Sequence, residues 1–78
     1  MSERDGETVL DLTGLLCPLP VLKAGKRLAG MAPGAVLTVI ATDPMAEIDM
    51  AHFCRERGYL LMEQSREGQS FIFRIARP

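Results

Sequence analysis

The sequence lacks any strong excess of one charge and any apolar run long enough to cross a membrane. Nine of its 78 residues are Lys or Arg and ten are Asp or Glu, so the formal charge at pH 7 is -1. This near balance gives no general attraction to nucleic-acid phosphates or to anionic membranes. The opening residues, MSERDGE, are polar and acidic, whereas a signal peptide begins with a basic and then an apolar segment. We therefore expect a cytoplasmic protein that binds neither nucleic acid nor membranes directly.

Cysteine is also scarce, because the chain has only Cys17 and Cys54, which lie far apart. A secreted framework of disulfides is not expected, since 47% hydrophobic residues are enough for an ordinary core. Neither cysteine has a second cysteine two residues away, which excludes a thioredoxin-like dithiol. Two cysteines and the lone His52 form a weak set of metal ligands. We expect reduced thiols, no metal and no cofactor.

The length of the chain limits it to one hydrophobic core. A chain of this size buries only about 60% of the surface that it exposes when unfolded. The sequence has no internal repeat, linker or low-complexity run. Residues 1–6 are polar and have no periodicity, so they are expected to form a flexible N-terminal tail. Residues 7–78 are expected to form a single domain.

Hydrophobic periodicity predicts four strands and two helices in that domain. The expected elements are, in order, a strand over 7–12, a helix from 18 to about 31, a strand over 36–41, a helix that starts near 43 and stops at 58, and strands over 59–65 and 70–76. The order is βαβαββ. Right-handed crossovers then predict an α/β (α+β) two-layer sandwich, in which a four-stranded mixed sheet carries two helices on one face.

Helical and strand spacing also predicts which residues face the core. The expected core residues are Leu10 and Leu12 of the first strand, Val21, Ala24, Gly25, Leu28 and Ala32 of the first helix, and Ala46, Met50, Phe53 and Cys54 of the second helix. Asp43 is expected to cap the second helix, with Pro44 at its first position, and Gly58 is expected to end it. Cys54 is therefore interpreted as an inert, buried residue.

The stretch LLCPLP, residues 15–20, places a cysteine where the first strand leads into the first helix. A residue before proline is restricted to extended backbone, so Cys17 is expected at the N-cap or just outside it. There the helix dipole favours a thiolate and should lower the pKa of Cys17. Pro18 and Pro20 have no amide hydrogen, which leaves the Leu19 N–H as the main donor for an anion. These residues alone leave open whether Cys17 is a nucleophile on a rigid platform or a small buried residue.

Cys17 has no evident catalytic partner in the sequence. His52 falls on the second predicted helix and is interpreted as incidental. A cysteine without a base or an oxyanion site is poorly equipped to turn over a substrate, but it can accept and release a sulfur atom. Three classes therefore remain: a persulfide carrier with no turnover reaction of its own, a thiol redox sensor, and a small protein-interaction module in which Cys17 is structural.

Residues 11–20, DLTGLLCPLP, resemble the signature of the TusA/SirA-like sulfur-carrier (sulfurtransferase) family, whose core is Cys-Pro-x-Pro. The resemblance continues through residues 42–44 (TDP) and 53–55 (FCR). It implies a βαβαββ sandwich whose motif cysteine, Cys17, receives sulfane sulfur as a persulfide and passes it to a partner protein. The residues that would support the motif are Gly14, Pro18 and Pro20.

The resemblance also implies partners. Members of the family serve tRNA thiolation, molybdenum cofactor biosynthesis and sulfur oxidation, with cysteine desulfurases or rhodanese-like proteins as donors and sulfur-relay proteins as acceptors. Lys23, Lys26 and Arg27 lie opposite the predicted core face, where they form either a solvated surface or one that steers an acidic partner. Leu16 and Leu19 stand where several members have polar residues, which predicts a more apolar docking surface around Cys17.

Overall fold

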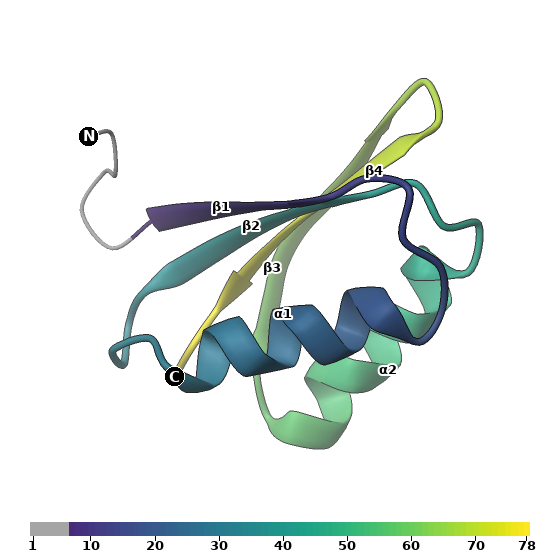
Figure 1. Ribbon diagram of the computed structural model, residues 1–78. Helices are drawn as coiled ribbons and strands as arrows, with labels where there is room; N and C mark the ends of the chain where they lie inside the picture. Colours follow the sequence, from purple (N-terminus) through teal and green to yellow (C-terminus); the bar gives the residue numbers. More distant parts are fainter. Residues whose placement is uncertain (1–6) are drawn as a thin grey trace.

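The computed structural model describes residues 7–78 and has two layers, a four-stranded sheet and two helices that pack on one of its faces (Figure 1). The strands are β1 (Glu7–Leu12), β2 (Val36–Ala41), β3 (Leu60–Glu67) and β4 (Ser70–Ala76), and the helices are α1 (Leu19–Ala29) and α2 (Ala46–Arg57). The predicted βαβαββ order and the two-layer α+β fold are confirmed. The predicted flexible tail, residues 1–6, lies outside the described residues.

The strands lie in the order β1-β2-β4-β3. β1 and β2 are parallel, which requires the crossover that α1 supplies, whereas β4 pairs antiparallel with both β2 and β3. β2 therefore lies inside the sheet, between β1 and β4. β1 is an edge strand. Leu12, at its end, is 3% exposed, whereas Leu10 is only partly buried.

The core lies between the sheet and the helices. Its largest fully buried side chains are Phe73, Leu28, Leu37, Met50, Ile75 and Val39. All four residues predicted for the core face of α2 are buried. On α1 the prediction is correct for Ala24, Gly25 and Leu28, whereas Val21 is partly buried. Ala32 was wrongly placed on this face, because α1 ends before it and Ala32 is exposed.

The C-terminal end of the chain helps to determine where α1 stops. Gly30 is the C-cap, and the guanidinium of Arg77 donates hydrogen bonds to the carbonyls of Leu28, Ala29 and Met31 at 3.4, 3.1 and 2.7 Å. A cation at this position satisfies carbonyl groups that have no partner within the helix and opposes the negative end of the helix dipole. The predicted end near Met31 was therefore about two residues too late. Within residues 7–78, neither helix is long and apolar enough to cross a membrane.

The start of α2 also differs from the prediction. The helix begins at Ala46 with Met45 at the N-cap, so Asp43 and Pro44 precede it. Asp43 nevertheless binds the entering chain, because its Oδ1 accepts the Met45 N–H at 3.2 Å and its carbonyl accepts the Ala46 N–H at 2.9 Å. The predicted capping carboxylate is thus present, but it lies two residues before the N-cap.

The hairpin of β3 and β4 has a shorter connection than predicted. Glu67 pairs with Ser70, so only Gly68 and Gln69 form the turn. Gly68 has a φ of 61°, which suits a residue without a Cβ atom. β3 is the other edge strand of the sheet and is mostly exposed, so its hydrophobic pattern is weak. For this reason the strand predicted over 59–65 ended before the observed end at Glu67.

Gly58 and Gly30 offer a matched test of the two helix ends. Gly58 ends α2 with a φ of 76°, in the left-handed region, whereas Gly30 ends α1 with a φ of -93°. We expect Gly58→Ala to lower the free energy of unfolding by about 1 kcal/mol, because a Cβ atom disfavours this backbone conformation. Gly30→Ala should cost little, since an added Cβ would lie 3.7 Å from its nearest neighbour. Urea denaturation measures both, and equal losses would contradict the interpretation.

Candidate functional site

Cys17 lies on the turn between β1 and α1, one residue before Pro18, which is the N-cap of α1. The side chain is exposed, so Cys17 is not a buried core residue. The Cys17–Pro18 peptide bond is cis. Pro20 occupies the first turn of α1 and is buried there. Cys17 therefore stands just outside the helix, as the sequence predicted, and Pro20 is compatible with the helix start.

Hydrogen bonds attach this turn to the loop that precedes α2. The Gly14 N–H donates to Thr42 Oγ1 at 2.9 Å, and the Cys17 N–H donates to Asp43 Oδ2 at 2.9 Å. Gly14 has a φ of 86°, a conformation that glycine adopts without strain. Two segments that are about 27 residues apart in the chain therefore fix the backbone on both sides of Leu15 and Leu16.

The Leu19 N–H is not free for an anion, contrary to the prediction. It donates to the Leu16 carbonyl at 2.9 Å and so closes the turn that carries Cys17. Pro18 and Pro20 have no N–H to offer in its place. The start of α1 therefore presents the thiol on a closed turn and supplies little backbone stabilisation to a bound anion.

Two aspartates surround the thiol. Asp49, in the first turn of α2, places a carboxylate oxygen within 4.8 Å of Cys17 Sγ, and its interaction with the thiol is the largest cause of a raised pKa of Cys17. Desolvation adds to it, followed by the negative charges of Asp49 and Asp43. The predicted lowering of this pKa is wrong, because that prediction considered only the dipole of α1. The fold also brings the acidic start of α2 to the same place.

The acidic surroundings raise the question of a metal. Cys17 Sγ and one carboxylate oxygen from each of Asp43 and Asp49 lie within 4.8 Å of one another. Both oxygens of Asp43, however, already accept backbone N–H groups. We therefore interpret the cluster as the environment of a thiol, and the expectation that the chain holds no metal stays a prediction.

A groove of about 510 Å³ opens beside the thiol between α1 and α2. Its apolar lining comes from Val21, Ile48 and Phe53. We call this space the thiol groove. His52 also lines it, but the nearest ionic partner of its imidazole is Glu56, at 3.7 Å. His52 therefore lies closer to the site than the sequence indicated, but its imidazole pairs with the carboxylate of Glu56 and not with the thiol of Cys17.

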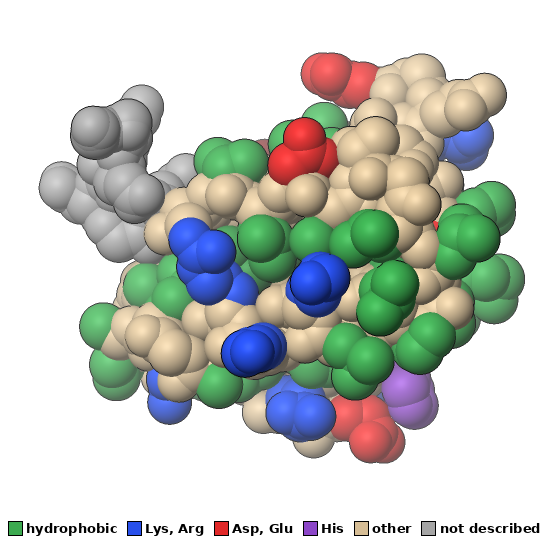
Figure 2. All heavy atoms as spheres, viewed as in Figure 1, with side chains coloured by type: hydrophobic (Ala, Val, Ile, Leu, Met, Phe, Trp, Pro, Cys, Tyr) green, Lys and Arg blue, Asp and Glu red, His purple; other side chains and the backbone are tan. Residues whose placement is uncertain are grey.

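Exposed hydrophobic side chains surround the opening. Figure 2 shows hydrophobic side chains gathered at the end of the molecule where α1 begins, next to the single histidine. Leu16 and Leu19 flank Cys17 and are 62% and 42% exposed, while Met45 and Ile48 at the start of α2 are 47% and 65% exposed. We call these four residues the apolar rim. The apolar surface predicted from Leu16 and Leu19 is present, and α2 extends it.

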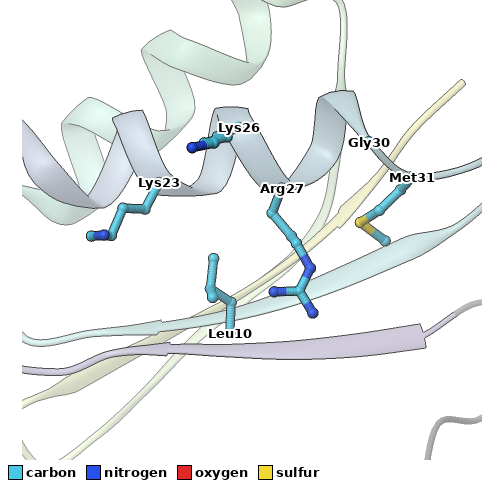
Figure 3. Close-up of a pocket in the computed structure, with 6 residues that line it drawn as sticks. All are labelled: Leu10, Lys23, Lys26, Arg27, Gly30 and Met31. Atoms are coloured by element: carbon cyan, nitrogen blue, oxygen red, sulfur yellow. The ribbon is translucent and has the colours of Figure 1, made fainter.

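Lys23, Lys26 and Arg27 border a second groove, of about 410 Å³, toward the other end of α1. In Figure 3, Leu10 of β1 points toward α1, while Arg27 reaches from α1 toward the strands. Gly30 and Met31 complete the lining, and within residues 7–78 no acidic side chain contributes to it. We call this surface the basic groove. The three cations are exposed, as predicted, but they surround an apolar floor that the sequence pattern did not reveal.

Cys54, unlike Cys17, is buried. It is 2% exposed and packs in the core with Met50 and Phe53. Desolvation by burial raises the pKa of the Cys54 thiol to about 11. Since a thiol reacts as its thiolate, Cys54 is protected both by its neighbours and by its protonation.

Comparison with known proteins gives consistent matches. The family model described as Sulfurtransferase TusA matches residues 8–77. A sulfur carrier protein TusA from Allochromatium vinosum is 48% identical over 71 residues, which is 91% of this chain and 93% of the relative. The protein of the same name from Pseudomonas aeruginosa is 41% identical over 69 residues, or 88% and 87%. The crystal structure of a SirA-like protein from Desulfitobacterium hafniense has a TM-score of 0.78 at 26% identity and covers 87% of this chain and 93% of that one.

The raised pKa of Cys54 predicts how stability depends on pH. The unfolded thiol loses its proton near pH 9, whereas the folded thiol keeps it to about pH 11. The free energy of unfolding should therefore be unaffected by this group below pH 9 and should fall by up to about 2 kcal/mol as the pH rises to 11. Cys54→Ala lacks this contribution. Urea denaturation from pH 8 to 11 should show the stability advantage of the parent protein shrinking, and a constant difference would contradict the prediction.

Proposed function

Because the chain belongs to the TusA sulfurtransferase family, we propose that it is a sulfur carrier that accepts sulfane sulfur as a persulfide on Cys17 and transfers it to a partner protein. The observation that carries the proposal is the exposed Cys17 thiol on a turn whose backbone is fixed by Asp43. Gly14, Pro18 and Pro20 support that turn. A rigid, accessible thiol is what a carrier needs in order to meet two different proteins in turn.

The transfer needs no cofactor. The Cys17 thiolate attacks the outer sulfur of a donor persulfide, a new S–S bond forms at Cys17, and the donor S–S bond breaks and leaves the donor cysteine as a thiolate. In the second step, an acceptor thiolate attacks the outer sulfur on Cys17, and Cys17 returns as a thiolate. Atoms and electrons balance in both steps. We expect no turnover of a small substrate by the carrier alone.

The surfaces around the thiol favour protein partners. The apolar rim would exclude water when a partner covers it, so that sulfur transfer takes place in a dry interface. The basic groove would attract an acidic segment of a partner and increase the rate of encounter. A sulfur donor such as a cysteine desulfurase or a rhodanese-like protein, and an acceptor from a sulfur relay, are partners of this kind. We propose that they meet the carrier in the cytoplasm, where thiols stay reduced.

The two alternative functions have less support. A redox sensor benefits from a resolving cysteine near the reactive one, but the only other cysteine in the chain, Cys54, is buried in the core. An interaction module with a structural Cys17 gives no reason for an exposed thiol on so constrained a turn. The carrier accounts for both observations.

The two cysteines provide the first test. Cys17→Ser should fold, because serine is compatible with the start of a helix, but it should lose all sulfur loading, since a hydroxyl cannot hold sulfane sulfur. Cys54→Ser should still load while unfolding more easily, by roughly 1 to 3 kcal/mol, because a hydroxyl enters the core. Mass spectrometry after incubation with a cysteine desulfurase and cysteine measures the reducible one-sulfur adduct.

The same spectra separate the alternatives. A sulfenic product at Cys17 without sulfur loading would favour the redox sensor, and an unmodified Cys17 would favour the interaction module. Sulfur loading that persists in the Cys17→Ser protein would refute the assignment of the site.

The basic groove provides a second test. Reversing two charges, in Lys23→Glu/Lys26→Glu, should raise the desulfurase concentration needed for half-maximal loading by roughly threefold to tenfold at low salt. Arg55→Glu is the control, because Arg55 is exposed on α2 and lines neither the basic groove nor the thiol groove. Loading from a small persulfide, such as glutathione persulfide, should be the same in all variants. An effect of Arg55→Glu equal to that of either single variant, Lys23→Glu or Lys26→Glu, would show that only net charge matters.

A further inference from the structure

We propose that Asp49 is a positioning residue that holds the unloaded Cys17 thiol in its protonated form and so suppresses reactions of the free carrier outside sulfur transfer. The inference rests on the proposed function of Cys17 as the sulfur-bearing residue. It adds a role for a residue on the other helix, which sequence reasoning from the motif did not identify.

The geometry gives Asp49 and Asp43 different tasks. Each carboxylate places one oxygen within 4.8 Å of Cys17 Sγ. Asp43 is 4% exposed, and its two oxygens accept the N–H groups of Cys17 and Met45, so it acts on the backbone. Asp49 is partly exposed, lines the thiol groove beside Cys17, and is the largest cause of the raised pKa of the thiol. Asp49 is therefore the group that acts directly on the proton of Cys17.

The other charged groups near the thiol come from the same helix. His52, Glu56 and Arg57 of α2 line the thiol groove, and His52 and Glu56 pair with each other at 3.7 Å. In the part of the chain that the structure describes, α1 contributes only the apolar Val21 to this lining, and no strand contributes a charged side chain. Asp49, with Asp43 behind it, thus dominates the electrostatics at Cys17, and it raises the pKa of the thiol.

The carboxylate of Asp49 affects both the unloaded and the loaded carrier. The thiolate is the form that attacks electrophiles and reacts with oxidants. Because little thiolate is present at neutral pH, the unloaded carrier reacts slowly with them. In the loaded carrier, Cys17 is the leaving group when a small thiol attacks the outer sulfur. A thiol of higher pKa leaves less readily, so sulfur is also retained. Asp49 would therefore confine sulfur exchange to complexes in which a partner changes the surroundings of the thiol.

The test is the pH profile of Cys17 alkylation by iodoacetamide in the full chain, measured by peptide mass spectrometry so that Cys54 is counted separately. Asp49→Asn should move the midpoint of the profile to lower pH and make alkylation at pH 7 roughly threefold or more faster. Glu47→Gln is the matched control, because it removes the same charge from the same turn of α2 but lies outside the thiol groove. Its profile should coincide with that of the parent protein.

Two further variants guard against a purely structural explanation. Asp49→Glu keeps the carboxylate and should restore most of the parent profile. Asp49→Ser also removes the charge, with a side chain of a different shape, and should behave like Asp49→Asn. Urea denaturation shows whether each variant is folded, and the test remains valid if only one of the two folds. Coincident profiles for the parent protein and both uncharged variants, or an equal shift in Glu47→Gln, would overturn the inference.

Failure of this inference can be distinguished from failure of the proposed function. The alkylation profile needs no sulfur donor, and the loading assay on the parent protein needs no Asp49 variant. Normal loading with unshifted profiles would remove only the role of Asp49. Shifted profiles in a protein that never loads sulfur would leave the role of Asp49 in thiol protonation and remove the carrier.

Discussion

The buried carboxylate of Asp43 joins the starts of the two helices, and the geometry of the site depends on it. One oxygen accepts the N–H of Cys17 before α1, and the other accepts the N–H of Met45 before α2. Hydrogen bonds to a charged acceptor are each worth about 1.5 to 3 kcal/mol. Because the carboxylate is 4% exposed, little water competes for these bonds. The position of the thiol relative to α2 therefore depends directly on this side chain.

This link has an electrostatic consequence. It places a thiol at the start of α1, where the helix dipole favours a negative charge, next to Asp49 in the first turn of α2 and Asp43 just before α2, whose carboxylates disfavour it. The interaction with Asp49 and the nearby negative charges prevail, because the backbone N–H groups that would express the dipole are absent at Pro18 and Pro20 and occupied at Leu19. The paired prolines thus shape the turn and leave the charge of the thiol to its neighbours.

Local sequence patterns predicted the helices and strands, whereas contacts between residues far apart in the chain determine the features that were not predicted. The core face of α2 and its end at Gly58 depend on spacing and on one backbone conformation, and both were predicted. Arg77, about 48 residues away in the chain, binds the carbonyls at the end of α1, and Asp49 is the largest cause of the raised pKa of Cys17. Residue spacing carries no information on such pairs. The position of Cys17 could therefore be predicted from the motif, but its chemical environment could not.

The apolar rim and the basic groove lie toward opposite ends of α1. Cys17 precedes the helix, and Arg27 lies about 12 Å along the helix from its first residue, Leu19, at the rise of an α-helix. A protein partner, which commonly covers about 800 Å² of each surface, can reach both, whereas a small persulfide reaches only the thiol. In the proposed sulfur transfer, the cations would act on the rate of encounter and the rim would act on the docked complex. A thiol that is weakly reactive in the free carrier is compatible with this division, because selectivity then comes from the partner's docking rather than from the sulfur alone.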